Sequence, residues 1–189
     1  MNLPNKLTML RVLMIPLLII VYLLKNYFPT AYLWIMGILF LVAALTDYFD
    51  GVIARKRNIV TTFGKFMDPL ADKLLVLTAL IILADNHFYV DWMWMPFWFV
   101  LIILGRELIV TAIRLVAVSE GKVIAASNLG KLKTGSTMVA ILWYFFLMNI
   151  NNPVINVIGW VLMGIALLFT IVSGVDYFWK NRKLIFQSI

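Results

Sequence analysis

The sequence predicts an all-α integral membrane protein: one bundle of six transmembrane helices over residues 1–189, with a short interfacial segment at the N-terminus. Three observations support this fold class. The 189 residues are 63% hydrophobic with a mean hydropathy of +0.98, which is too apolar for a soluble domain of this length. Long charge-free runs recur along the chain. The connections between them are too short to hold a separate soluble domain.

The first two spans follow from the first two charge-free runs. Residues 12–24 carry no charge and follow the polar, basic start MNLPNKLTMLR. Because no small-x-small cleavage pattern comes next, we expect an uncleaved first helix rather than a signal peptide. Residues 27–46 form a second charge-free run, which is long enough to cross a bilayer core and ends at Asp47.

The third and fourth spans must contain charged residues. The charge-free part of the third, residues 74–84, is too short to cross alone, so a crossing helix has to include Asp68 and Asp72. The fourth run, residues 92–104, continues into a charged stretch that begins at Arg106. Ionisable groups held at membrane depth usually carry function.

Residues 134–150 and 153–175 complete the set as ordinary spans, and an even number of crossings puts both termini on one side. All of the 16 Lys and Arg residues except Lys25 fall on that side. The positive-inside rule therefore predicts cytoplasmic termini and a cytoplasmic face for the charged cluster. The net charge of +7 then suits anionic headgroups and phosphate ligands, and nucleic acid is not expected as a partner.

Four carboxylates lie in the stretch DYFDGVIARKRNIVTTFGKFMDPLAD, residues 47–72. Asp47 and Asp50 are three apart and Asp68 and Asp72 four apart, so each pair shares one face if its segment is helical. Carboxylates crowded near lipid either take up protons or hold cations. With no cysteine and a single histidine, oxygen ligation of two divalent cations is expected; the ligand type suits Mg²⁺, Mn²⁺ or Ca²⁺, and Mg²⁺ is expected first with Mn²⁺ as the alternative.

Small and basic residues accompany these carboxylates. Gly51 lets a bulky ligand approach the backbone, and Ala54 lies about one turn further along. Arg55 adds a cation, and Gly64 opens the next helix, where backbone amides are free. This combination predicts a phosphorylated ligand, specifically a diphosphate.

The order D(x2)DG(x2)AR(x8)G(x3)D(x3)D, which runs from Asp47 to Asp72, resembles the signature of the CDP-alcohol phosphotransferase family at all eight fixed positions. The resemblance implies that a CDP-linked lipid donates its phosphatidyl group to an alcohol and releases CMP. It further implies that Asp72 is the base and that the protein is a homodimer. The residues implied to bind CDP-diacylglycerol are Gly51, Ala54, Arg55 and Gly64.

Basic residues outside the motif suggest a second pocket. Arg106 and Arg114 are eight apart and lie on one helical stripe. Glu107 should project about 100° away from Arg106, so we expect the missing anion to be a ligand. Lys131 and Lys133 enter the fifth span from the same side, with headgroup contact as the alternative.

Asn5, Thr8 and Arg11 follow one another at roughly helical spacing and could reach the same face, although Arg11 could instead be an interface anchor. Such a basic pocket suits an acceptor alcohol that carries its own phosphate. The pieces PNKLTMLR, GRE and GKLKT also resemble the phosphatidylglycerophosphate synthase branch of the family, whose acceptor is sn-glycerol 3-phosphate. This resemblance implies phospholipid biosynthesis at the bacterial cytoplasmic membrane.

Two alternatives stay open. A sister transferase would use inositol phosphate or phosphatidylglycerol as the acceptor, and residue types alone do not separate these from glycerol 3-phosphate. A protein of another class, a cation transporter with intramembrane aspartates, would also place carboxylates inside a helical bundle. Transporter sites favour the bilayer midplane between repeated, broken helices, whereas these carboxylates gather toward one face and the sequence has no repeat.

Overall fold

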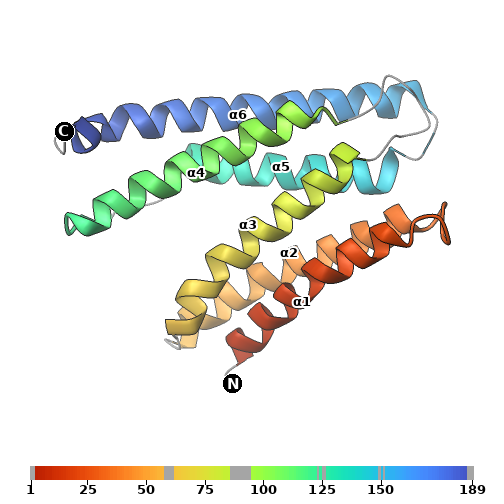
Figure 1. The fold of residues 1–189 in the computed structure, drawn as a ribbon, viewed down its shortest axis with the longest axis horizontal. Coiled ribbons are helices and arrows are strands. Elements are labelled where there is room, and N and C mark those ends of the chain that lie inside the picture. The colour runs from red at the N-terminus through yellow and green to blue at the C-terminus, as the bar shows by residue number, and fades with distance from the viewer. Residues whose placement is uncertain are drawn as a thin grey trace. The chain divides into compact units, whose positions relative to one another are not determined.

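The computed structural model describes residues 3–57, 62–85, 95–122, 124, 127–148, 150 and 152–186, with side chains described from Asn5 to Arg182 except at 47–63, 65 and 66 within these ranges. This part of the chain folds into α-helices (Figure 1). They are α1 (Leu3–Leu23), α2 (Tyr32–Arg57), α3 (Thr62–Asp85), α4 (Phe97–Ser119), α5 (Asn128–Leu147) and α6 (Pro153–Phe186).

The helices form two compact units. The first comprises Met1–Trp94 and Ile141–Asn151, and the second comprises Met95–Ala140 and Asn152–Ile189. Helix α5 therefore contributes its final turns to the first unit and its earlier turns to the second.

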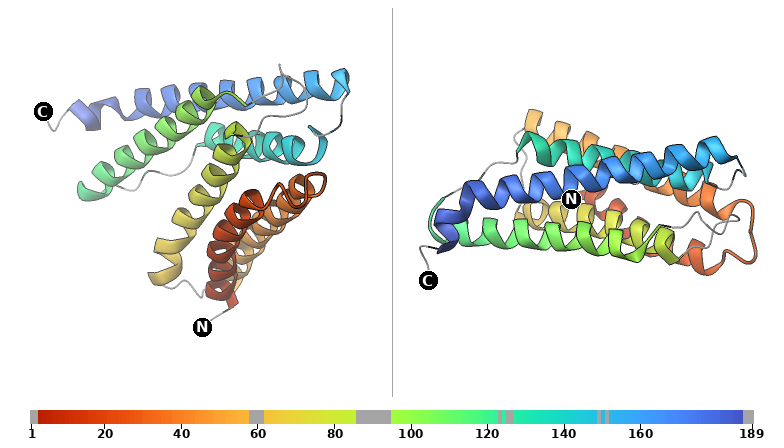
Figure 2. Two further views of the ribbon diagram at one scale, coloured as in Figure 1. Left: turned by 45° about the vertical axis from the view of Figure 1, so that its right-hand side comes forward. Right: turned by 90° about the horizontal axis from the view of Figure 1, so that it is seen from above.

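In the first unit, α1 packs against both α2 and α3 (Figure 2). Helix α2 buries a stripe made of Leu33, Met36, Phe40 and Ala43, whose spacing of three and four residues places them on one face. Phe40 also meets Phe145 of α5, with ring centroids 6.1 Å apart. The apolar core of this unit therefore includes one face of α2 and the ring of Phe145.

The far ends of α1 and α3 are joined by polar groups. The Tyr22 hydroxyl donates a hydrogen bond to the carboxylate of Asp85. Lys25 Nζ donates to the Tyr22 oxygen at 2.8 Å and lies 4.2 Å from the centroid of that ring. This contact fixes the ends of the two helices that lie opposite Thr8 and Asp68.

In the second unit, α4 lies along α6, and Val110, Ile113 and Tyr177 form a buried cluster between them. Helix α4 ends at Ser119; in the turn after it Gly121 has a φ of 73°, and the amide of Lys122 donates back to the Ala117 carbonyl at 2.8 Å. A residue without a side chain adopts this left-handed turn at little cost.

Side-chain caps at their starts stabilise α5 and α6, and α6 also contains an ion pair. Ser127 Oγ accepts a hydrogen bond from the Gly130 amide at 3.1 Å and caps α5. Asn152 Oδ1 accepts from the Val154 amide at 2.9 Å at the start of α6. On α6, Lys180 pairs with Asp176 at 2.9 Å.

The helical class is confirmed, whereas the number of spans and the side of the termini stay predictions. By length and composition, Asn5–Leu23 and Pro153–Arg182 are apolar enough to cross a membrane, and Tyr32–Thr46 is a shorter apolar helix. The predicted N-terminal interfacial segment is part of α1, which is continuous from Leu3, and its position at the membrane interface stays a prediction. Helix α3 includes Asp68 and Asp72, as the short charge-free run requires.

Candidate active site

The backbone of α2 is helical through the acidic motif. The helix passes Asp47 and Asp50 without a break and ends at Arg57, so this acidic pair does lie in a helical segment. The predicted residues whose side chains lie outside the described set are Asp47, Asp50, Gly51, Ala54 and Arg55.

The other two carboxylates are described, and one of them meets α1. Asp68 and Asp72 are half-buried on α3, one helical turn apart, and Gly64 is buried one turn before Asp68. Thr8 Oγ1 donates a hydrogen bond to Asp68 Oδ1 at 2.6 Å. Because Thr8 is only 1% exposed, this hydroxyl fixes the carboxylate from inside the unit.

The predicted stripe on α1 faces the interior. Asn5 is half-buried, and Thr8 and Arg11 are buried, with Arg11 at 0% exposure. A fully buried guanidinium does not fit the interface-anchor alternative for Arg11. The stripe is therefore part of the interior that also contains Asp68.

The two carboxylates that the structure describes have the oxygen donors that a hard divalent cation prefers, but they are only half of the predicted set of four. Asp68 and Asp72 offer oxygen donors, the type that Mg²⁺ and Mn²⁺ prefer. Among the described residues, no group of three or more His, Cys, Asp or Glu side chains gathers as a metal site. The four-carboxylate cluster accordingly stays a prediction.

In the second unit, one carboxylate holds two cations. Glu107 Oε1 accepts from Arg106 Nη1 at 2.9 Å and from Lys133 Nζ at 2.8 Å. The expectation that Glu107 would project away from Arg106 and leave it without a protein anion is wrong. The arginine side chain is long enough to turn back to its neighbour, and Lys133 of α5 approaches the same oxygen.

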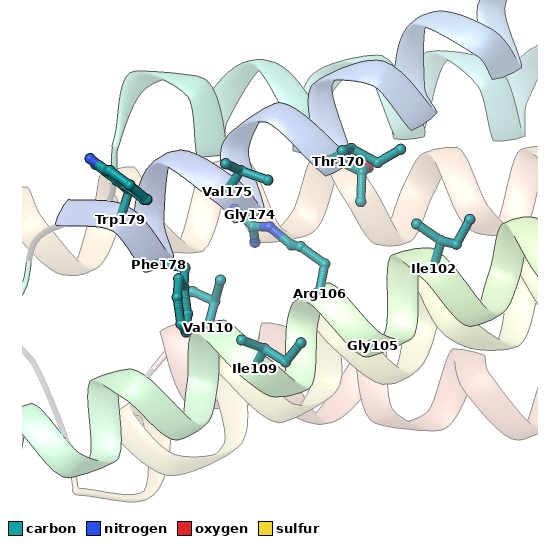
Figure 3. Close-up of a pocket in the computed structure, with 11 residues that line it drawn as sticks. Ile102, Gly105, Arg106, Ile109, Val110, Thr170, Gly174, Val175, Phe178 and Trp179 are labelled. Atoms are coloured by element: carbon teal, nitrogen blue, oxygen red, sulfur yellow. The ribbon is translucent and has the colours of Figure 1, made fainter. Parts of the chain in front are cut away.

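Arg106 fits into a space left by glycines. A Cβ at Gly174 of α6 would lie 3.1 Å from Arg106 Cγ, and a Cβ at Gly130 of α5 would lie 3.6 Å from Arg106 Nη2. Figure 3 shows the Arg106 side chain extending from α4 toward Gly174, beside Val175. Here α4 and α6 border a largely apolar groove of about 420 Å³, and Arg106 Nε is buried without a hydrogen-bond partner among the described residues.

Two other predicted cations lie elsewhere in the second unit. Arg114 is exposed, and its Nε donates to the Tyr177 hydroxyl at 3.1 Å while the guanidinium lies 5.6 Å from that ring. Lys131 is exposed, and Lys133, two residues later, is buried, since positions two apart point in nearly opposite directions around a helix. Of the four basic residues predicted in this unit, Arg106 and Lys133 therefore share one anion.

Glu107, Tyr177 and Ser127 were not predicted to support the site. Adjacent residues on a helix do not normally face each other, so the sequence rule argued against a contact between Arg106 and Glu107. No local pattern signals that Lys133, 26 residues later, reaches the same carboxylate. The sequence signal that could have pointed to Glu107 is the tripeptide GRE, residues 105–107, in which Glu107 directly follows a predicted site residue.

Comparison with known proteins now decides the family. A profile of the CDP-alcohol phosphatidyltransferases matches residues 1–172. The chain belongs to this family. Enzymes of the family generally depend on a divalent cation and are membrane-associated, which agrees with the apolar helices α1 and α6. The cation-transporter alternative is not supported by this assignment.

The chain is also similar to individual enzymes over most of its length. It is 43% identical to the CDP-diacylglycerol--glycerol-3-phosphate 3-phosphatidyltransferase of Bacillus subtilis (strain 168), covering 99% of this chain and 98% of that protein. It is 36% identical to the enzyme of that name from Salmonella choleraesuis, covering 93% and 92%. A probable phosphatidylglycerophosphate synthase of Mycobacterium tuberculosis is 39% identical, covering 93% and 79%.

Proposed function

We propose that this protein transfers the phosphatidyl group of CDP-diacylglycerol to sn-glycerol 3-phosphate, giving phosphatidylglycerophosphate and CMP. The observation that carries the proposal is the complete acidic motif of residues 47–72, within a chain similar almost from end to end to enzymes of that name. Membership of the CDP-alcohol phosphatidyltransferase family supports the reaction class.

The carboxylates Asp47, Asp50, Asp68 and Asp72 would hold two divalent cations, Mg²⁺ in the first place. When bound, such ions neutralise the diphosphate and the charge that builds on the leaving group. Thr8, through its hydrogen bond, would hold Asp68 in one orientation for this purpose. The set contains oxygen donors alone, in keeping with a hard cation.

Asp72 would act as the base. The acceptor hydroxyl oxygen forms a bond to the phosphorus that carries diacylglycerol, and the bond from this phosphorus to the bridging oxygen breaks. CMP leaves with the bridging oxygen, while the hydroxyl proton passes to the Asp72 carboxylate. Asp72 lies one turn from Asp68 on α3, so a base and a metal ligand would share one rigid element. Gly51, Ala54, Arg55 and Gly64 would bind the cytidylyl part of the donor.

A basic pocket would bind the phosphate of the acceptor. Arg106 and Lys133 bring two positive charges to one carboxylate, so this cluster keeps a net positive charge that suits a phosphate group. The remaining residues proposed for acceptor binding are Asn5, Thr8, Arg11, Arg114 and Lys131. A neutral acceptor would gain less from these cations, which favours glycerol 3-phosphate over an unphosphorylated alcohol.

We further propose that six helices cross the bacterial cytoplasmic membrane, with the active site facing the cytoplasm. The support is the charge asymmetry, since Lys25 alone of the 16 Lys and Arg residues is expected on the far side. Homodimer formation is proposed on the family resemblance.

The test is a transfer assay with the purified protein in detergent–lipid micelles. CDP-diacylglycerol is offered with sn-glycerol 3-phosphate, inositol phosphate or phosphatidylglycerol, with and without EDTA, and CMP release and the lipid product are measured. We expect phosphatidylglycerophosphate with the first acceptor alone, its loss with EDTA and its return when Mg²⁺ is added in excess. Transfer to another acceptor in preference, or full activity in EDTA, would contradict the proposal.

A further inference from the structure

We propose that Glu107 is a positioning residue, which holds Arg106 and Lys133 in the arrangement that receives the phosphate of the acceptor. This inference rests on the proposed function and assigns a role to a carboxylate outside the acidic motif. Its basis is the shared oxygen: Glu107 Oε1 lies 2.9 Å from Arg106 Nη1 and 2.8 Å from Lys133 Nζ.

The contact joins two helices whose cations are largely sheltered from water. The side chains of Arg106 and Lys133 are 13% and 5% exposed, and that of Glu107 is 24% exposed. Long basic side chains have many rotamers, and a carboxylate that binds both of them restricts that freedom before the ligand arrives. Gly130 and Gly174 leave the room in which Arg106 lies, and Figure 3 shows Arg106 beside Gly174.

Donors remain for a ligand after the contact with Glu107 is made. In the contacts that the structure describes, Lys133 uses one of the three hydrogens of its ammonium group on this carboxylate. Arg106 Nε is buried and makes no hydrogen bond within the described part of the chain. Two cations and one anion leave the cluster with one net positive charge, which suits a phosphate group as its further anion.

The direction in which the acceptor KM changes when Glu107 loses its charge separates a positioning role from simple charge balance. A carboxylate beside a phosphate site repels the phosphate, so removal of its charge alone would strengthen acceptor binding. If Glu107 instead holds the two cations in place, removal of its charge weakens acceptor binding, although the local charge becomes more positive. The KM for the acceptor therefore moves in opposite directions under the two roles.

The experiment compares Glu107→Gln, Glu107→Asp and the wild-type full-length protein in the micelle assay, with both substrates varied. We expect Glu107→Gln to raise the KM for sn-glycerol 3-phosphate by about tenfold, the effect of one charge-assisted hydrogen bond. We expect the KM for CDP-diacylglycerol to stay at the wild-type value. Glu107→Asp keeps the charge but shortens the side chain, so its acceptor KM should also rise.

Two controls complete the design. Asp176→Asn breaks an exposed ion pair on α6 in the same unit and should leave both KM values unchanged. In a Lys133→Met background, Glu107→Gln should raise the acceptor KM less than it does alone, because one of the two cations that Glu107 holds is already gone. Thermal unfolding of each variant is measured alongside the kinetics.

The inference is overturned if the acceptor KM of Glu107→Gln is unchanged or lower than that of the wild type. It is equally overturned if both Glu107 variants lose thermal stability with no change in acceptor KM, or fail to fold, since either result makes the carboxylate structural. Failure of the proposed function would look different, because the wild-type protein itself would then form no phosphatidylglycerophosphate from sn-glycerol 3-phosphate.

Discussion

Thr8 and Asp68 are 60 residues apart in sequence, yet a buried hydroxyl on α1 donates to a carboxylate on α3. We predict that Thr8→Val, which keeps the shape and removes the hydroxyl, raises the Mg²⁺ concentration needed for half-maximal transfer by about tenfold. A hydrogen bond to a charged group contributes about 1.5–3 kcal/mol, which covers an effect of that size. The measurement is a Mg²⁺ titration of CMP release.

Thr8→Ser is the matched control, since it keeps the hydroxyl and should restore most of the metal response. An unchanged Mg²⁺ titration in Thr8→Val would mean that the hydrogen bond to Asp68 does not affect cation binding.

Asp72 is the proposed base, and Asp72→Asn tests this role. The amide has nearly the same shape but does not accept the acceptor proton, so we expect transfer to fall by at least about a hundredfold, at the low end of the range for loss of a general base. Because the substitution removes a charge near lipid, membrane insertion and thermal unfolding should stay close to those of the wild type. Activity within a few-fold of wild type would contradict the assignment.

Some features of the candidate site follow from helical spacing in the sequence, and others do not. The pairing of Asp68 with Asp72 follows from a spacing of four on one helix, and a sequence displays such a spacing directly. The ion-pair partners of Glu107 do not follow from local spacing. Adjacent residues such as Arg106 and Glu107 are not expected to face each other, and the contact of Lys133 with Glu107 depends on how α5 lies relative to α4. Helical spacing alone predicted that the anion beside Arg106 would be a ligand, whereas in the folded chain Arg106 pairs with Glu107.

At the scale of whole elements, the sequence located the helices better than their ends. Charge-free runs mark the part of each helix that avoids ionised groups, whereas the backbone helix continues into charged residues. Helix α2 therefore runs to Arg57, beyond its charge-free run, and α6 runs to Phe186 rather than to Val175. Hydropathy detects the apolar part of a helix, and its last turns depend on capping and packing instead.

Helix α2 and the last turns of α5 approach each other closely at Gly37. A Cβ there would lie 2.7 Å from Phe146 Cε1 and 3.1 Å from Phe145 Cβ. We predict that Gly37→Ala destabilises the protein by about 1–3 kcal/mol, the usual cost of overpacking, because the phenyl ring and the helix both have to move. A lower midpoint of thermal unfolding in detergent would be the measured result.

Gly164→Ala on α6 is the control for this prediction, because the structure places nothing within 4 Å of a Cβ at that position. Alanine favours a helix over glycine by about 1 kcal/mol, so this variant should match or exceed wild-type stability. Equal effects of the two substitutions would argue against close packing at Gly37.

For the molecule as a whole, the proposed orientation can be tested by labelling, because the sequence contains no cysteine. Lys122→Cys follows α4 on the proposed cytoplasmic side, and Ile150→Cys lies between α5 and α6 on the far side; both positions are exposed. In intact spheroplasts, a membrane-impermeant maleimide should react with Ile150→Cys alone. Lys122→Cys should react only after permeabilisation, and the reverse pattern would invert the orientation.

The positions of residues along the long helix α6 indicate the depth at which the acceptor phosphate would bind. Its 34 residues span about 51 Å at 1.5 Å per residue, against a hydrocarbon core of about 30 Å. Arg182 lies 4.5 Å from the ring of Trp179, a pair suited to the headgroup layer. Gly174, beside Arg106, precedes Trp179 by about 7.5 Å along the axis. With α6 crossing the bilayer as proposed, a water-soluble acceptor descends below the headgroups to be phosphatidylated, while the lipid donor need not leave its leaflet.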